Sequence, residues 1–244
     1  DSVVHSIIYD EDKKKAIGVR VIDAHTKSVT EYFAKVIFLN ASTLNSNLIL
    51  LNSTSDRFPN GLGNDSGLLG KYVAFHNYRG VVTATHEGHK DKRVDGRKPT
   101  SAYVPRFRNV HRQETDFLRG YAAGFGARKI MKYNTSGLGN ELYDNLMDSG
   151  EGDAWRVRSH MMGETIPKEE NQVSLDENLV DAWGIPQLKV AVDYDENDEK
   201  MLKDFFDEFS EMYRKAGFTN IQTIDNNRIP GNDIHEMGGV RMGH

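Results

Sequence analysis

The 244-residue sequence contains no cysteine, which excludes disulfide bonds and thiolate metal sites. It also lacks a run of about 18 apolar residues, so no segment is expected to span a membrane. The net charge of −5 offers no basic surface of the kind that binds nucleic acid. With 38% hydrophobic and 27% charged residues, the chain has the balance of a globular protein. We therefore expect a small-molecule function, without metal, nucleic acid or a membrane span.

A dinucleotide-binding fingerprint is also missing. Gly61-Leu62-Gly63 and Gly137-Leu138-Gly139 lack the third glycine of Gly-x-Gly-x-x-Gly. The chain opens on a strand pattern and stops in a glycine-rich motif, so we interpret it as a fragment of a longer protein. Because it starts with Asp1 and not Met, the N-terminus leaves cytoplasm and periplasm equally open.

The C-terminal residues contain the most unusual motif, in which His235 precedes Gly238 and Gly239 by three residues. Histidine exchanges protons near neutral pH, and glycine lets the backbone approach a ligand closely. A surface histidine beside a simple turn is the alternative. A helical zinc motif is excluded, because its second histidine would fall on Gly239.

The pattern His-x-x-Gly-Gly-x-x-Met-Gly, formed by His235, Gly238, Gly239, Met242 and Gly243, resembles the C-terminal motif of the glucose–methanol–choline (GMC) family of flavin oxidoreductases. The resemblance is closest to the bacterial sugar and sugar-acid dehydrogenase branch. It implies that His235 faces an FAD and acts on the substrate hydroxyl, with Gly238 and Gly239 beside the cofactor.

Residues 1–75 have the pattern of an antiparallel meander, with strands over 3–8, 18–23 and 29–39. Residues 36–39 are apolar throughout, which predicts a strand buried on both faces. A small-residue turn and a helix follow. A plain strand–helix turn is one interpretation; the family resemblance implies that Asn40, Ala41 and Ser42 contact the FAD. Asn47 stands where the family usually has proline.

Two further stretches resemble the family. The first runs from Phe58 to His76, where the family passes from its flavin domain into its substrate domain. His76 is a candidate for substrate contact, and a structural histidine bonded to backbone is the alternative. The second begins at Glu164 and continues to Pro186. Glu164 is a weaker substrate candidate, for which a salt bridge at a strand edge is the alternative.

The middle of the chain has the pattern of strands over 81–85, 103–107, 117–125, 155–162, 171–175 and 188–192, with a short helix over 140–147 and a longer one nearer the C-terminus. A charged loop at 87–99 should be exposed and mobile. Aromatic and arginine residues on the predicted strands suit sugar binding and ordinary sheet packing equally well. The helix expected over 198–216 has an apolar stripe that needs a sheet to cover, and Asp195 or Asn197 can cap its start. The stripe consists of Met201, Leu202, Phe205, Phe206, Phe209, Met212 and Tyr213.

These patterns predict an α+β fold with part of an FAD-binding domain at 1–75, a substrate domain at 76–230 and a return to the FAD domain at 231–244. The resemblance implies oxidation of an alcohol or sugar hydroxyl, with His235 as the base and with a quinone or a partner protein as a possible electron acceptor. We expect FAD to bind the parent protein but not this fragment, and a second catalytic group to follow His244. The alternative is a non-catalytic carbohydrate-binding module with a structural histidine.

Overall fold

The computed structural model describes residues 1–92, 101–131, 133–147, 151–232 and 234–241. It has an α+β fold, as predicted, and the chain divides into two compact units. Unit 1 comprises Asp1–Phe75, Ile166–Asp193 and Asp233–His244, and unit 2 comprises His76–Thr165 and Tyr194–Asn232. Residues 166–193 thus group with unit 1 by contact, whereas the expected FAD and substrate domains are functional assignments that stay predictions.

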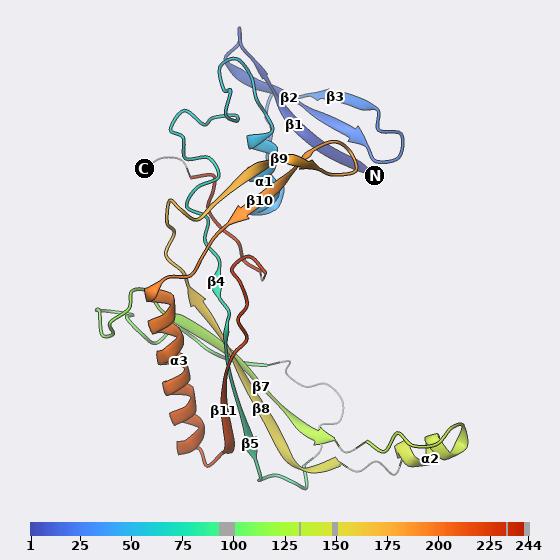
Figure 1. Ribbon diagram of the computed structural model, residues 1–244, viewed down its shortest axis with the longest axis vertical. Coiled ribbons are helices and arrows are strands. Elements are labelled where there is room, and N and C mark those ends of the chain that lie inside the picture. Colours follow the sequence, from blue (N-terminus) through green and yellow to red (C-terminus); the bar gives the residue numbers. More distant parts are fainter. Residues whose placement is uncertain (93–100, 132, 148–150, 233, 242–244) are drawn as a thin grey trace. The chain divides into compact units, whose positions relative to one another are not determined.

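Unit 1 contains the predicted meander, a hairpin and one helix (Figure 1). Strands β1 (Ser2–Asp10), β2 (Lys15–Asp23) and β3 (Val29–Phe33) pair in that order, all antiparallel. The hairpin joins β9 (Gln172–Val180) to β10 (Pro186–Ala191). Helix α1 (Ser42–Leu51) contacts β1, β9 and β10, which places its start at the centre of this unit.

The buried strand predicted over residues 36–39 is wrong. Strand β3 ends at Phe33, and residues 36–39 form no ladder in the described residues. Val36 is 66% and Phe38 81% exposed. An apolar run is buried on both faces only where neighbouring strands and helices cover it, and no described segment does so here.

Unit 2 is built on an antiparallel sheet. Within the described residues its strand order is β11-β5-β8-β7-β6, with the short β4 also paired to β8. The strands are β4 (His76–Asn77), β5 (Gly80–His86), β6 (Ala102–Val104), β7 (Tyr121–Met131), β8 (Glu151–Glu164) and β11 (Thr219–Asp225). Most of them follow the predicted patterns; β11 was missed because Asn, Gln and Thr interrupt its short apolar pattern.

Helix α3 (Glu196–Lys215) is the predicted long helix, and it covers one face of this sheet (Figure 1). Asp195 caps it by accepting from the backbone N–H groups of Asn197 and Asp198, and the Asp198 side chain completes a capping box. Its buried stripe packs against Val82, Val157 and Met161 in one hydrophobic cluster. The predicted packing of the stripe on a sheet is confirmed, although Met212 is 37% exposed.

Helix α2 (Asn140–Met147) lies where it was predicted. Of the charged loop at 87–99, Glu87 and residues 89–92 are exposed, and the remainder lies outside the described residues. None of the helices in the described ranges combines the length and apolar composition that a membrane span requires.

Candidate functional site

The C-terminal motif is held against the segment that follows α1. Met237 and Ala74 form an antiparallel bridge, with N–O distances of 3.0 and 2.9 Å. The Gly70 N–H donates to the Gly239 carbonyl at 2.7 Å, and the Gly239 N–H donates to the Lys71 carbonyl at 3.1 Å. Residues separated by more than one hundred positions in the sequence are therefore joined by backbone hydrogen bonds.

Both glycines of the motif adopt left-handed backbone conformations, with φ of 88° at Gly238 and 75° at Gly239. A Cβ on Gly238 would overlap the Tyr72 carbonyl oxygen, and a Cβ on Gly239 would overlap the Asn47 side chain. Glycine is thus required at each position by conformation and by close packing against the protein itself. That these glycines also approach a cofactor stays a prediction, and of the two only Gly238 lines a cavity.

Two side chains on the first turns of α1 hold the motif from the other side. The Thr43 hydroxyl donates to the Glu236 carbonyl at 2.7 Å. The Asn47 amide donates to the carbonyls of Thr43, at 2.9 Å, and Gly238, at 3.3 Å. Asn47 is fully buried, and its Oδ1 accepts no hydrogen bond from the described residues. A clamp of this kind fixes the course of the motif.

Asn47 is a site residue that the sequence analysis missed. It was noted only as a departure from the family's proline. The available signal was its spacing, because Thr43 and Asn47 are four residues apart and share one face of a helix. Its partner in the C-terminal motif could not be found from spacing, since nearly the whole chain separates them.

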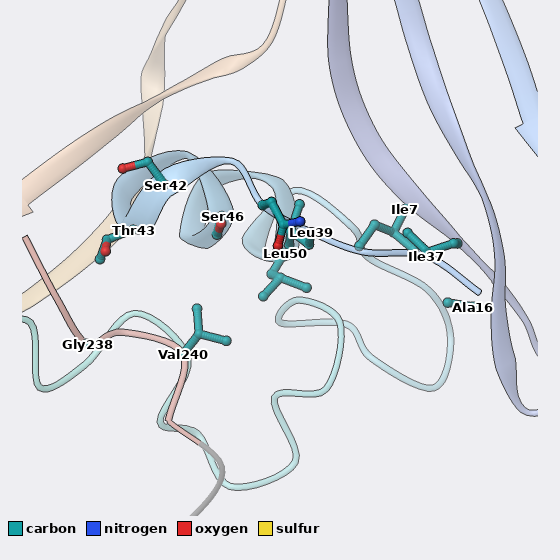
Figure 2. Close-up of a pocket in the computed structure, with 11 residues that line it drawn as sticks. Ile7, Ala16, Ile37, Leu39, Ser42, Thr43, Ser46, Leu50, Gly238 and Val240 are labelled. Atoms are coloured by element: carbon teal, nitrogen blue, oxygen red, sulfur yellow. The ribbon is translucent and has the colours of Figure 1, made fainter.

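A cavity of about 570 Å³ lies where α1 and the motif meet, as Figure 2 shows. It is lined by Asn40, Ser42, Thr43 and Ser46 from the start of α1 and by Gly238 and Val240 from the motif. Apolar side chains close the rest, namely Ile7, Ile37, Leu39 and Leu50, with Ala16 beside them. The lining is neutral, with hydroxyl and amide groups on one side and hydrocarbon on the other.

The cavity includes three of the five residues predicted to bind a cofactor: Asn40, Ser42 and Gly238. Ala41 instead lines a neighbouring groove of about 440 Å³, which Asn40 shares. Gly239 lines neither and is buried against Asn47. Tertiary structure thus joins the two ends of the predicted cofactor site.

The start of α1 has properties of its own. Ala41 is at the N-cap position and supplies no side-chain hydrogen bond, while Ser42 adopts a φ of 64°. The first backbone N–H groups of a helix have no intrahelical partner and favour anionic or acceptor atoms. With Ser42 and Thr43 on the cavity wall, the start of this helix is suited to a ligand's acceptor groups.

His235 lies just ahead of the clamped segment, and its side chain is exposed. Its φ of 68° is in the left-handed region, where residues other than glycine are sparse and histidine is among the enriched exceptions. Such conformations persist where the surroundings fix the backbone, and here the clamp begins one residue later at Glu236. His235 is not among the residues that line the 570 Å³ cavity. Met242 and Gly243 of the motif, and His244, lie outside the described residues.

The two substrate candidates, His76 and Glu164, both belong to unit 2 and are paired residues on β4 and β8. His76 Nδ1 lies 3.1 Å from the Gly163 carbonyl oxygen, as the structural alternative expects. The Glu164 carboxylate accepts from Arg106 at 3.3 Å and from Arg119 at 3.2 Å, and its side chain is 43% exposed. Glu164 is therefore a salt-bridged surface carboxylate, and a substrate role for either residue stays a prediction.

No cluster of three or more potential metal ligands occurs in the described part of the chain. Comparison with models of protein families finds no match.

Two curated proteins are similar to the chain at low identity. One is the 2-methyl-1,2-propanediol dehydrogenase of Mycolicibacterium austroafricanum, 28% identical over 240 residues, which cover 94% of this chain and 42% of the relative. Another is the fructose dehydrogenase large subunit of Gluconobacter japonicus, 25% identical over 253 residues, which cover 99% of this chain and 44% of the relative. The chain thus spans less than half the length of the curated relatives that it matches, both of which are named as dehydrogenases.

Proposed function

We propose that this chain is part of an FAD-dependent oxidoreductase of the GMC type that oxidises a hydroxyl-bearing carbon of an alcohol or sugar. The observation that supports it most directly is the cavity shared by the start of α1 and the C-terminal motif, because two stretches that resemble this family independently line one pocket. The names of both curated relatives describe dehydrogenases of a diol and a sugar, which supports the same class of reaction.

The residues present suit one wall of a flavin site. The uncapped start of α1 offers backbone donors, Asn40 and Ser42 offer polar side chains, and Gly238 contributes backbone to the lining. These residues would hold the cofactor with Ala41 nearby. FAD, when bound, supplies an acceptor for the hydride that leaves the carbinol carbon. The neutral, half-apolar lining of the cavity is compatible with a flat aromatic ring system.

His235 would accept the proton of the substrate hydroxyl at a ring nitrogen. An alcohol becomes a good hydride donor only as its hydroxyl proton leaves, so a base within hydrogen-bond reach accelerates the reaction by about 10²–10⁴. The exposed ring is accessible to substrate, and the clamped backbone from Glu236 to Gly239 fixes its starting point. Thr43 and Asn47 therefore serve to position the motif.

The test is His235→Ala in the complete gene product, with 2-methyl-1,2-propanediol and fructose as the first substrates. Turnover should fall at least about 10²-fold while flavin content is unchanged, because the variant removes a base and leaves the cavity intact. His25→Ala is the matched control, since His25 is an exposed histidine of the same unit with its side chain 76% exposed. If the substrate reduces the flavin of His235→Ala at an unchanged rate, His235 is not the base.

Cofactor retention provides a second test. The isolated 244-residue chain should not retain FAD, because the diphosphate of a dinucleotide needs a glycine-rich strand–helix turn that this sequence lacks. Flavin absorbance that persists through dialysis of the isolated chain would contradict this expectation. If the complete gene product binds no flavin either, the proposed function itself is contradicted.

A further inference from the structure

Unit 2 contains a second, larger cavity of about 980 Å³ whose described lining residues all belong to that unit. Four arginines line it: Arg128 on β7, Arg156 and Arg158 on β8, and Arg228 after β11. Tyr78 and His160 form part of the same lining, and no acidic residue occurs among the lining residues that the structure describes. The formal net charge of the whole chain is −5, so this concentration of positive charge is not a reflection of composition.

Arg128, Arg156 and Arg158 lie on the face of the sheet opposite to α3. Side chains alternate along a strand, and Val157, Ser159 and Met161 of β8 face α3, where Ser159 is bonded to Tyr213. Arg156, Arg158 and His160 therefore project from the other face. On β7 the residues paired with Arg158 and His160 are Gly126 and Gly124.

Of these two glycines, Gly126 leaves the floor of the cavity open, whereas Gly124 is covered by the His160 ring. A Cβ on Gly124 would lie 2.6 Å from the His160 ring, so the imidazole rests directly on the backbone there. Gly126 has no side chain to cover Arg158, and it lines the cavity itself. A sheet face on which glycines stand opposite a histidine and an arginine is hollowed in its middle.

The charge arrangement costs stability unless something neutralises it. Arg128 and Arg156 are direct partners on adjacent antiparallel strands, which places their Cβ atoms about 4.5–5.5 Å apart, and like charges in that relation repel. Arg158 follows Arg156 on the same face, at about 6.6 Å along the strand. In the described residues, no carboxylate forms an ion pair with any of these three arginines.

Two other arginines of unit 2 are neutralised by carboxylates of the protein itself. Arg79 is paired with both Asp225 and Glu199, and Arg108 with both Asp204 and Glu208. Each of these guanidinium groups has two carboxylates within ion-pair distance. Arg128, Arg156 and Arg158 differ from them because they have no such ion pair in the described residues and line an open space of ligand size.

We propose that this cavity binds a small polyhydroxylated organic anion, with a carboxylate or a phosphate ester held by the cluster Arg128, Arg156 and Arg158. Guanidinium groups bind both oxyanions through paired hydrogen bonds. The volume matches a small-molecule site. The Tyr78 ring contacts that of His160 at 5.3 Å between centroids, tilted by 49°, and lies beneath the Arg228 guanidinium at 5.4 Å, so it adds an aromatic group to the wall for a sugar skeleton. Asn226 and Ser101 add polar groups for hydroxyls.

Binding of an anion in this cavity can be measured without turnover, so the result does not depend on the proposed oxidation. The protein is titrated calorimetrically at low salt with D-gluconate, D-glucose 6-phosphate and neutral D-glucitol. D-Gluconate and D-glucitol share an open, polyhydroxylated six-carbon chain and differ in charge, whereas D-glucose 6-phosphate presents its hydroxyls mainly on a pyranose ring. Inorganic phosphate is included as a fourth probe. At least one of the two organic anions should bind about tenfold tighter than glucitol, and added salt should weaken it.

The double variant Arg156→Gln/Arg158→Gln should lose this preference for anions. It should be no less stable than the wild type, because the substitutions relieve repulsion between like charges. Arg214→Gln is the matched control: Arg214 is exposed on α3, at the other face of the sheet, and its loss should leave binding unchanged. Arg158→Lys provides a milder variant that keeps the charge and removes the planar fork, and it should weaken binding.

Gluconate as the tighter ligand would assign the cavity to carboxylates, and glucose 6-phosphate would assign it to phosphate esters. Equal affinity for glucitol and both organic anions would overturn the proposal. So would binding of inorganic phosphate alone, or an equal loss of affinity in Arg214→Gln and the double variant. Trp155 also lines the cavity, so its fluorescence in a Trp183→Phe background locates the bound ligand, and an unchanged Trp155 signal on saturation would contradict this site.

Discussion

Units 1 and 2 bury their apolar side chains to different extents. In unit 2 one cluster extends over the sheet and the stripe of α3 apart from Met212, and Phe205, Met201 and Met161 in it are completely buried. In unit 1 the corresponding cluster is confined to Val73, Phe75 and Val173 with a few partly buried neighbours. Large apolar side chains are exposed in both units, along β3 and after it in unit 1, as at Phe33 and Phe38, and on α2 in unit 2, as at Tyr143 and Met147.

The two units are therefore stabilised mainly by different interactions. Unit 2 is organised by hydrophobic burial of a helix on a sheet, which is non-directional and proportional to area. The part of unit 1 around the C-terminal motif is organised by directional hydrogen bonds from Thr43, Asn47 and the 70–74 backbone to that motif. Damage to the first should therefore affect a whole unit, and damage to the second should stay local.

Phe205→Ala is expected to have the largest effect. Phe205 is fully buried, stacks edge-to-face on Tyr121 and lies 4.6 Å from Phe209 between ring centroids. The free energy of unfolding of unit 2 should fall by about 3–5 kcal/mol, whereas Met212→Ala on the same helix should cost far less. Trp155 lies in unit 2 and Trp183 in unit 1, so denaturant unfolding followed in the two single-tryptophan backgrounds reports each unit. Equal destabilisation of both units would contradict the comparison.

Gly239→Ala should come next, with an effect confined to unit 1. The residue must keep a φ of 75° and would press its Cβ into Asn47, so a cost of about 1–3 kcal/mol is expected from the backbone alone. Gly63→Ala is the control for that backbone cost, since its φ is 77° and a Cβ there meets nothing within 4 Å.

Overlap with Asn47 should make Gly239→Ala the more destabilising of the two. Combining it with Asn47→Ala removes the overlapping atoms, so the double variant should lose less stability than the sum of the single variants. Hydrogen exchange at the Met237 and Gly239 amides is the local readout. Strict additivity would show that Asn47 and Gly239 do not interact.

A smaller effect is expected from pH in unit 2. The hydrogen bond from Arg79 holds the pKa of Asp225 below its ordinary value of 3.8. Because the folded state lowers this pKa, the stabilisation is fully present above 3.8 and is lost as pH falls through the folded value. Asp225→Asn should therefore reduce the stability of unit 2 at neutral pH and weaken its dependence on pH in the acid range. An unchanged acid profile in denaturant titrations would argue against this contribution.

Phe38→Ser should have the smallest effect. With 81% of Phe38 exposed, the stability of unit 1 should change by no more than about 0.5 kcal/mol. A loss several times larger, measured through Trp183, would show that this side chain packs against something and that the contrast between the units is weaker than described.

Residues 36–39 show where prediction from sequence failed. Four apolar residues in a row favour burial, but burial requires neighbouring segments that cover both faces of the strand. None of the described segments covers residues 36–39 in this way. The arginines of β7 and β8 are a second case. The sequence patterns did not single them out, and only the register, which sets Arg128 against Arg156 and Gly126 against Arg158, revealed the clustering of their positive charge.

What the sequence determined by itself was local or periodic. The stripe of α3 follows from helical spacing, and the hydrogen-bonding capacity of short polar side chains limited its cap to Asp195 or Asn197, of which the structure has Asp195. The α+β class and the β1–β3 meander follow from alternation and hairpin-sized connections. What only the tertiary structure decided was the meeting of distant segments: Asn47 with Gly238, and Asn40 and Ser42 with Gly238 around one cavity. The physical reason is that a hydrogen bond or a cavity wall depends on distance in space, and no local pattern encodes which remote backbone will occupy that space.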